Sequence, residues 1–89
     1  AGGRTGSGGG VIRVLYFAAL ADQAGRHEEW LTPEPSDTAQ QLYERLAQQR
    51  GLRLSRRQLR VAINEQFADW SDVLRAGDQV AFLPPMSGG

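Results

Sequence analysis

The chain contains no cysteine and no lysine, and it has a single histidine. Without cysteine it can form neither a disulfide framework nor a structural zinc site, and it has no thiol nucleophile. Without lysine it offers no side-chain amine for Schiff-base chemistry or for accepting an isopeptide bond. Ten arginines balance ten acidic residues, so no overall field gathers nucleic acid or an anionic membrane. We therefore expect no metal site, no nucleic-acid partner and no membrane partner.

Long apolar stretches are also missing. The longest run covers the eight residues 14–21, whereas a membrane-spanning helix needs about 20. No secretory signal pattern opens the chain, which is compatible with a cytoplasmic protein. Residues 1–10 hold six of the eleven glycines and no large apolar side chain, which is typical of a flexible linker or a processing remnant. We expect one domain over residues 11–85, followed by a flexible tail at 86–89.

The apolar pattern predicts the order of the secondary-structure elements. Residues 11–17 are apolar on both faces apart from one arginine, which predicts a strand that is largely covered on both sides. A short helix and a weaker strand follow, then the main helix, and then further strands joined by a hairpin turn and a helical turn. The short helix is predicted at 18–24 and the weaker strand at 26–31. The later strands are predicted at 59–63, 67–70 and 79–83. A hairpin turn at 64–66 joins the first two of them, and a helical turn at 71–75, which Ser71 would cap, precedes the last.

The main helix has the most regular pattern. Its apolar positions have the spacing of one buried helical face: Ala39, Leu42, Tyr43, Leu46 and Ala47. Asp37 would cap its first turn with Gln40 in a capping-box position, and Gly51 would end it. We therefore expect an α+β domain in which a mixed sheet of four or five strands packs on one main helix.

The C-terminus carries the clearest functional signal. A core-type strand runs directly into Pro84 and Pro85, which fix the backbone and direct the following residues away from the domain. An extended chain from Pro84 to Gly89 would reach roughly 20 Å. Because Gly88 and Gly89 have no Cβ, they could pass through a channel too narrow for other residues. The terminal carboxylate is a poor electrophile at neutral pH, so reaction at Gly89 would require an external activating enzyme.

The ending Val-Ala-Phe-Leu-Pro-Pro-Met-Ser-Gly-Gly, residues 80–89, resembles that of the small, sulfur-carrying subunits of molybdopterin synthase. The segments at 14–18 (Val-Leu-Tyr-Phe-Ala), 62–64 (Ala-Ile-Asn) and 74–80 (Leu-Arg-Ala-Gly-Asp-Gln-Val) are similar to the same family. The Gly-Gly end alone would be a weak signal, because ubiquitin-like modifiers and the thiamin sulfur carrier share it. The resemblance implies a β-grasp, ubiquitin-like fold, which agrees with the predicted order of elements.

The resemblance also implies a mechanism. A ubiquitin-activating-type enzyme would use ATP to adenylate Gly89, and a sulfur donor would convert it to a thiocarboxylate. The tail would then enter the active site of the large synthase subunit and donate sulfur to cyclic pyranopterin monophosphate in molybdenum cofactor biosynthesis. By this resemblance the chain is no enzyme on its own and binds no cofactor. It would be the sulfur-donating subunit of a heteromeric sulfurtransferase, in which two small subunits flank a dimer of large ones.

Strand parity predicts where a partner would bind. Phe17 and Leu83 would leave the sheet on the face away from the helix, and Phe67 would be an exposed aromatic after the hairpin turn. Such apolar patches mark interfaces, although these side chains could also form a second, minor core. The resemblance places the large subunit on this face. The predicted partner-binding residues are Phe17, Phe67, Leu83, Pro84, Pro85, Met86 and Ser87.

Two other functions stay open. The chain could carry sulfur for another pathway, such as thiamin or cysteine synthesis, or it could be a ubiquitin-like protein modifier. It could also be a non-catalytic ubiquitin-like interaction module whose glycine end is incidental.

Several other charged and aromatic residues are expected to have no catalytic role. The arginines at positions 50, 53, 56, 57 and 60 favour a solvated connection over a nucleic-acid patch, with docking to an acidic patch on the activating enzyme as a third interpretation. His27 is expected on the surface, and Trp30 and Trp70 are expected in the core or at its boundary. The carboxylates at 28, 29, 69 and 72 show no spacing of an acid–base pair.

Overall fold

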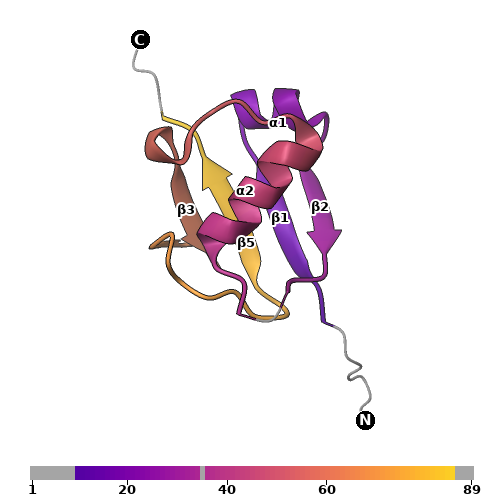
Figure 1. Cartoon of the computed structure of the whole chain (residues 1–89), viewed down its shortest axis with the longest axis vertical. Coiled ribbons are helices and arrows are strands. Elements are labelled where there is room, and N and C mark those ends of the chain that lie inside the picture. The colour runs from indigo at the N-terminus through magenta and orange to yellow at the C-terminus, as the bar shows by residue number, and fades with distance from the viewer. Residues whose placement is uncertain (1–9, 35, 86–89) are drawn as a thin grey trace.

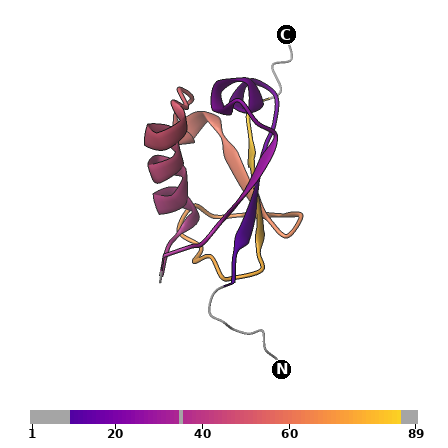
Figure 2. The ribbon, with the colours of Figure 1, turned by 90° about the vertical axis from the view of Figure 1, so that its right-hand side faces the viewer.

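The computed structural model describes residues 10–34 and 36–85. In this part the elements are β1 (Ile12–Tyr16), α1 (Ala19–Ala24), β2 (Glu28–Leu31), α2 (Ala39–Arg50), the 3-10 turn η2 (Arg56–Gln58), β3 (Arg60–Ile63), β4 (Gln66–Ala68) and β5 (Gln79–Leu83). The strands form one mixed sheet in the order β2-β1-β5-β3-β4, in which β1 and β5 are parallel and the other neighbours antiparallel. Figure 2 shows the main helix α2 lying along one face of the sheet. This arrangement confirms the predicted β-grasp fold, with five strands (Figure 1).

The predicted linker at 1–10 and the predicted tail at 86–89 lie outside the described residues, except for Gly10, so both stay predictions. Within the described residues, no helix is both long enough and apolar enough to cross a membrane.

Strand alternation decides which side chains meet α2. Along β1 and β5, every second residue is buried against the helix, as the parity predicted. Leu42 and Leu46 of α2 are fully buried against this face of the sheet. Burying each of these leucines contributes about 1.5–3 kcal/mol, so the helix–sheet layer contributes substantially to stability. The core residues on the two strands are Ile12, Val14, Tyr16, Val80 and Phe82.

The first turn of α2 begins one residue later than predicted. Thr38 is the N-cap: its Oγ1 accepts a hydrogen bond from Gln41 N at 3.2 Å, and its N–H donates to Gln41 Oε1 at 3.0 Å. Asp37, which we predicted as the cap, is buried instead and pairs with Arg45 Nη2 at 2.6 Å. The sequence spacing could not show which of the two residues is the cap, because aspartate and threonine are both good N-caps. The contact with Arg45 holds the Asp37 carboxylate away from the capping position.

Residues 71–75 do not form the predicted helical turn, so Ser71 caps no helix. Val73 instead forms an antiparallel bridge with Thr38. The backbone just before Val73 bonds to the start of α2: Ala39 N donates to Asp72 O at 3.0 Å, and Gln40 N donates to Trp70 O at 2.9 Å. These carbonyls satisfy N–H groups that the first turn of a helix leaves unpaired, and this pairing outweighs the local turn preference.

The predicted ends of both helices and the hairpin turn are confirmed. Gly25 and Gly51 lie in the left-handed region, with φ of 75° and 73°, and each donates its N–H back into the last turn of its helix. Asn64 and Glu65 join β3 to β4 with φ of 54° and 71°. Two consecutive positive φ values are typical of the tight turns that match the twist of a two-strand hairpin.

Candidate functional site

The end of β5 is the part of the domain from which the C-terminal tail begins. Because β5 runs parallel to β1, Phe82 pairs in register with Tyr16, so the two strands end side by side. Pro84 and Pro85 follow directly, at the end of the sheet where α1 lies (Figure 1). The predicted site residues Met86, Ser87, Gly88 and Gly89 lie outside the described residues.

Phe17, Phe67 and Leu83 come together on the sheet face away from α2, and we call these three residues the apolar patch. They surround a hollow of about 380 Å³ with Leu15, Ala62 and Ala81. Phe17 is 44% exposed and Phe67 is 72% exposed, so neither side chain is enclosed in a second core. The structure therefore gathers the three predicted residues into one surface beside the base of the tail.

A larger groove adjoins the apolar patch and shares its three residues. It has a volume of about 730 Å³, and Pro84 and Pro85 form one of its walls. We call it the tail-root groove. Its other walls are residues 57–61, which lead into and along β3, and residues 67–70 of β4 and the turn after it. The base of the tail thus lies beside the apolar patch, in a groove that also carries charged side chains.

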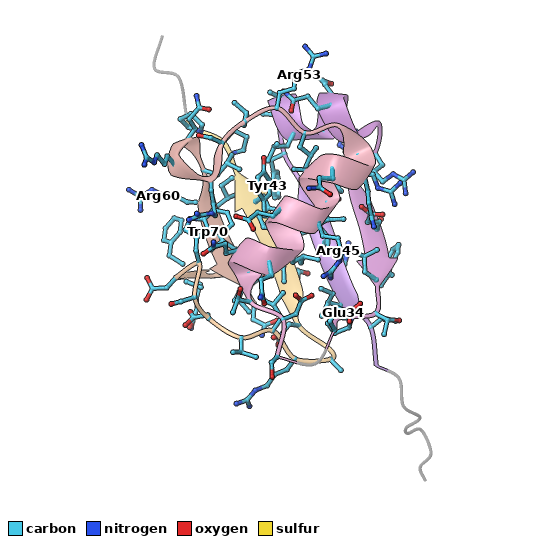
Figure 3. All side chains as sticks on the ribbon, viewed as in Figure 1. Glu34, Tyr43, Arg45, Arg53, Arg60 and Trp70 are labelled. Atoms are coloured by element: carbon cyan, nitrogen blue, oxygen red, sulfur yellow. The ribbon has the colours of Figure 1, made fainter. Side chains whose placement is uncertain are left out.

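Three arginines of the predicted solvated connection, Arg53, Arg57 and Arg60, are exposed, as predicted, while Arg56 is half-buried. The Arg56 guanidinium lies 5.9 Å from the centroid of the Trp70 ring and 3.8 Å from a carboxylate oxygen of Glu44. The Arg60 guanidinium lies 5.8 Å from the centroid of the Phe67 ring, within the range of a cation–π contact. Figure 3 shows Arg60 and Trp70 on the same side of the molecule, next to β3.

The two tryptophans have different surroundings. Trp70 is half-buried, as predicted for a boundary aromatic, and stacks on Phe82 with the ring centroids 5.9 Å apart. Trp30 is 57% exposed, so its placement at the core was wrong. Trp30 lies on an edge strand on the opposite face from Glu29, and the Arg13 guanidinium covers its ring at 5.8 Å.

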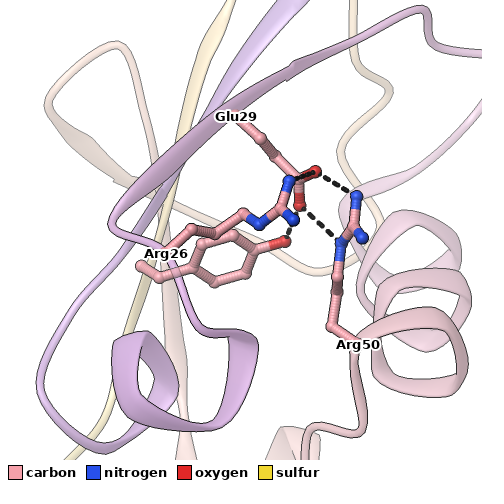
Figure 4. Close-up of polar contacts among 4 residues, drawn as sticks. Arg26, Glu29 and Arg50 are labelled. Carbon is pink, nitrogen blue, oxygen red and sulfur yellow. Dashed lines mark hydrogen bonds and ion pairs between the residues drawn. The ribbon is translucent and has the colours of Figure 1, made fainter.

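Sequence reasoning missed a buried polar cluster around Glu29. Arg50 Nη2 donates to its carboxylate at 2.5 Å and Arg26 Nη1 at 3.3 Å, while the Tyr16 hydroxyl donates to its second oxygen (Figure 4). These four residues come from β1, the turn before β2, β2 itself and the end of α2. Arg26 and Glu29 are close in the sequence, but no spacing connects them with Tyr16 and Arg50, because the packing of the helix on the sheet brings those residues together.

Opposing effects act on the pKa of Glu29. Burial by itself raises that pKa, but hydrogen bonds from Arg50 and Tyr16 and the charges of Arg50 and Arg26 outweigh it, so the pKa of Glu29 is lowered. Burial and the bond to Glu29 raise the pKa of the Tyr16 hydroxyl. Glu29 is therefore ionised and Tyr16 protonated at neutral pH, as a structural ion cluster requires. Neither group lines the tail-root groove.

The remaining carboxylates and the histidine form no metal-binding group in the described part of the chain. There, no group of three or more His, Asp or Glu residues could hold a metal ion. His27 is exposed at the start of β2, as predicted, and its backbone oxygen accepts a hydrogen bond from Tyr16 N at 2.8 Å.

Known proteins match the chain over nearly its whole length. The profile of the ThiS family matches residues 14–89. The molybdopterin synthase sulfur carrier subunit of Homo sapiens is 33% identical over 82 residues, which cover 88% of this chain and 93% of that protein.

Solved structures with the same fold also match it. SAMP1 from Haloferax volcanii has a TM-score of 0.73 at 24% identity, covering 90% of this chain and 100% of that one. A chain from the protein–protein complex of subunits 1 and 2 of the molybdopterin-converting factor of Helicobacter pylori has a TM-score of 0.62 at 21% identity, covering 89% and 99%. At these identities the structures support the fold alone. The family profile and the human relative, each covering more than four-fifths of the sequence, show that this chain belongs to the ThiS family.

Proposed function

We propose that this chain is the sulfur carrier subunit of a molybdopterin synthase. One observation carries the proposal: in a chain of the ThiS family, the apolar patch and the Pro84-Pro85 base of the tail lie together at one end of the sheet. A partner that covers the patch is thereby placed where it can receive the last residues of the chain. The human relative, which is named as such a carrier, supports the choice of pathway.

The chemistry of this function takes place at Gly89. An adenylating enzyme of the ubiquitin-activating type joins the terminal carboxylate to AMP from ATP and releases pyrophosphate. A sulfur donor at the oxidation level of hydrosulfide then displaces AMP and leaves a thiocarboxylate. This group is an anionic sulfur nucleophile at neutral pH, and the chain needs no cysteine to carry it. The sulfur donor and the acid–base groups belong to other proteins, and the adenylating enzyme uses the ATP.

The partner in the transfer step is the large synthase subunit. It packs on the apolar patch, and Pro84, Pro85, Met86 and Ser87 lead the two glycines into its active site. There the sulfur passes to cyclic pyranopterin monophosphate, and hydrolysis returns Gly89 to the carboxylate. The contribution of this chain is delivery: holding the nucleophile at a defined place replaces a bimolecular encounter with a local one.

The intact mass of the protein tests the carrier chemistry. The chain is incubated with ATP, the cognate adenylating enzyme and a sulfur source, and we expect a mass gain equal to one sulfur replacing one oxygen. A chain lacking Gly89 is the matched control and should show no gain. An unchanged mass for the full chain, with an activating enzyme that is active on another carrier, would refute the proposal.

A second assay separates the pathways. The thiocarboxylated chain is offered to the large molybdopterin synthase subunit with cyclic pyranopterin monophosphate, and in parallel to a thiazole synthase and a cysteine synthase. We expect turnover with the first acceptor. Turnover only with another acceptor would keep the carrier chemistry and replace the pathway.

A further inference from the structure

Two arginines beside the base of the tail have no acidic partner within the described residues. Arg57 and Arg60 are both exposed, and neither forms an ion pair there. Both line the tail-root groove together with Pro84 and Pro85. The groove contains one carboxylate, that of Asp69, and neither arginine is paired with it. The groove therefore has an excess of positive charge on a chain whose formal net charge is zero.

The backbone fixes where these two cations stand. Arg60 pairs in register with Leu83, so it emerges beside the last residue of β5. Arg57 lies in η2, whose ends are held by a capping box in which Ser55 N donates to Gln58 Oε1 at 3.0 Å. Both positions are thus set by regular structure rather than by an open loop, and a partner meets the charges at defined points.

We propose that Arg57 and Arg60 form a basic rim of the interface with the large synthase subunit, and that they pair with acidic side chains on that subunit beside its entrance for the tail. The inference rests on the proposed function, and it adds the chemistry of the partner surface. The tail-root groove is lined by all three residues of the apolar patch. A protein that covers the patch therefore reaches the rim of the groove. The unpaired positive charge of that rim selects an acidic surface.

The charges at such a rim act mainly before the tail is seated. Pairs at the edge of an interface steer the encounter and raise the association rate, and salt screens them because they remain partly in water. The apolar patch would hold the complex once it has formed. The rim and the patch therefore have different signatures: the rim changes the association rate and its salt dependence, while the patch changes the dissociation rate.

Binding to the cognate large subunit tests the inference. Association and dissociation rates are measured by surface plasmon resonance for the wild type and for the double variant Arg57→Glu/Arg60→Glu, at ionic strengths of about 0.02 and 0.15 M. The matched control is Arg53→Glu/Arg75→Glu. Each double variant replaces two positive charges with two negative ones. The control residues are exposed, form no ion pair in the described part of the chain and do not line the groove.

Neither control position lines the tail-root groove. Figure 3 shows Arg53 beside α1, away from Arg60. Arg75 precedes Gly77, whose N–H donates to Val11 O at the start of β1, so it lies at the end of the sheet opposite the tail. A circular dichroism melt of each variant shows whether it is folded.

We expect Arg57→Glu/Arg60→Glu to weaken binding by about tenfold at the lower salt, mostly through the association rate, and by less at the higher salt. The control should stay within about threefold of the wild type. Equal losses in the two variants, or wild-type binding by Arg57→Glu/Arg60→Glu, would overturn the inference while leaving the proposed function intact. The inference would also be overturned if Arg57→Glu/Arg60→Glu bound the large subunit normally but gained no mass with ATP, the adenylating enzyme and a sulfur source. That result would assign the rim to the activating enzyme. A wild-type chain that does not bind the large subunit would refute the proposed function itself.

Discussion

Replacing Glu29 with glutamine removes the charge at the centre of the buried polar cluster while keeping the size of the side chain. Glu29 is only 6% exposed, and the Arg50 and Arg26 side chains that face it are 27% and 43% exposed. Removing one partner of a fully buried ion pair costs about 3–5 kcal/mol, because the other charge is left uncompensated. Since water reaches both arginines, we expect a smaller loss of about 2–3 kcal/mol in the free energy of unfolding.

The matched control is Glu28→Gln, one residue earlier on the same strand. Glu28 pairs with Arg13 at 2.6 Å, but both side chains are at least 40% exposed. An exposed pair contributes about 0–1 kcal/mol, so this variant should be close to the wild type. Unfolding in urea, followed by circular dichroism, gives both free energies. Thermal melts should show the Glu29 variant about 8–24 °C lower, given about 4–8 °C per kcal/mol for a domain of this size.

The pH dependence gives an independent check on the same reasoning. Because the pKa of Glu29 is lowered in the folded state, its stabilising effect is complete above the unfolded-state pKa of about 4.3 and is lost as the pH falls through the lowered folded-state pKa. The gap between the wild type and Glu29→Gln should therefore be widest near neutral pH and should narrow below about pH 4. Equal stabilities of the Glu29 and Glu28 variants at pH 7, or a gap that does not change with pH, would refute this account of the cluster.

Three further substitutions test other parts of the structure. Thr38→Ala removes the cap that accepts from Gln41 N and should lower the free energy of unfolding by about 1 kcal/mol in urea titrations, whereas a value near zero would argue against the capping box. Asn64→Ala removes two side-chain hydrogen bonds, one donated to Asp78 Oδ1 and one accepted from Gln79 N, and it places an alanine at a backbone φ of 54°. Calorimetry should show that the free energy of unfolding falls by about 1–2 kcal/mol. An unchanged melting temperature would contradict this prediction. Phe67→Ser should keep the melting temperature within a few degrees of the wild-type value, because the ring is 72% exposed. The same variant should bind the large synthase subunit at least about tenfold more weakly. Normal binding by this variant would show that Phe67 is not part of the interface.

The elements that the sequence predicted correctly are those set by local periodicity. The apolar spacing of α2, the glycines that end both helices, and the alternation along β1 and β5 each depend on residues close together in the chain. The apolar patch followed from the same alternation: once Tyr16 and Phe82 face the helix, Phe17 and Leu83 must leave the sheet on the other face. The base of the tail was equally predictable, because Pro84 and Pro85 directly follow the last strand.

The tertiary structure alone decided the contacts between residues far apart in the sequence. The capping position moved from Asp37 to Thr38 because Arg45 binds the Asp37 carboxylate. Residues 71–75 contain a bridge rather than a helical turn because the carbonyls of Trp70 and Asp72 pair with the N–H groups at the start of α2.

Glu29 and Arg50 are 21 residues apart, and the packing of α2 on the sheet brings them into a buried ion pair that no spacing rule predicts. The same holds for Arg57 and Arg60. The sequence shows a run of arginines, but only the folded sheet places two of them beside Pro84 and Pro85 and leaves them without a carboxylate partner in the described residues. Local sequence fixes the faces of helices and strands, whereas the charges that meet across those faces depend on the geometry of the whole domain.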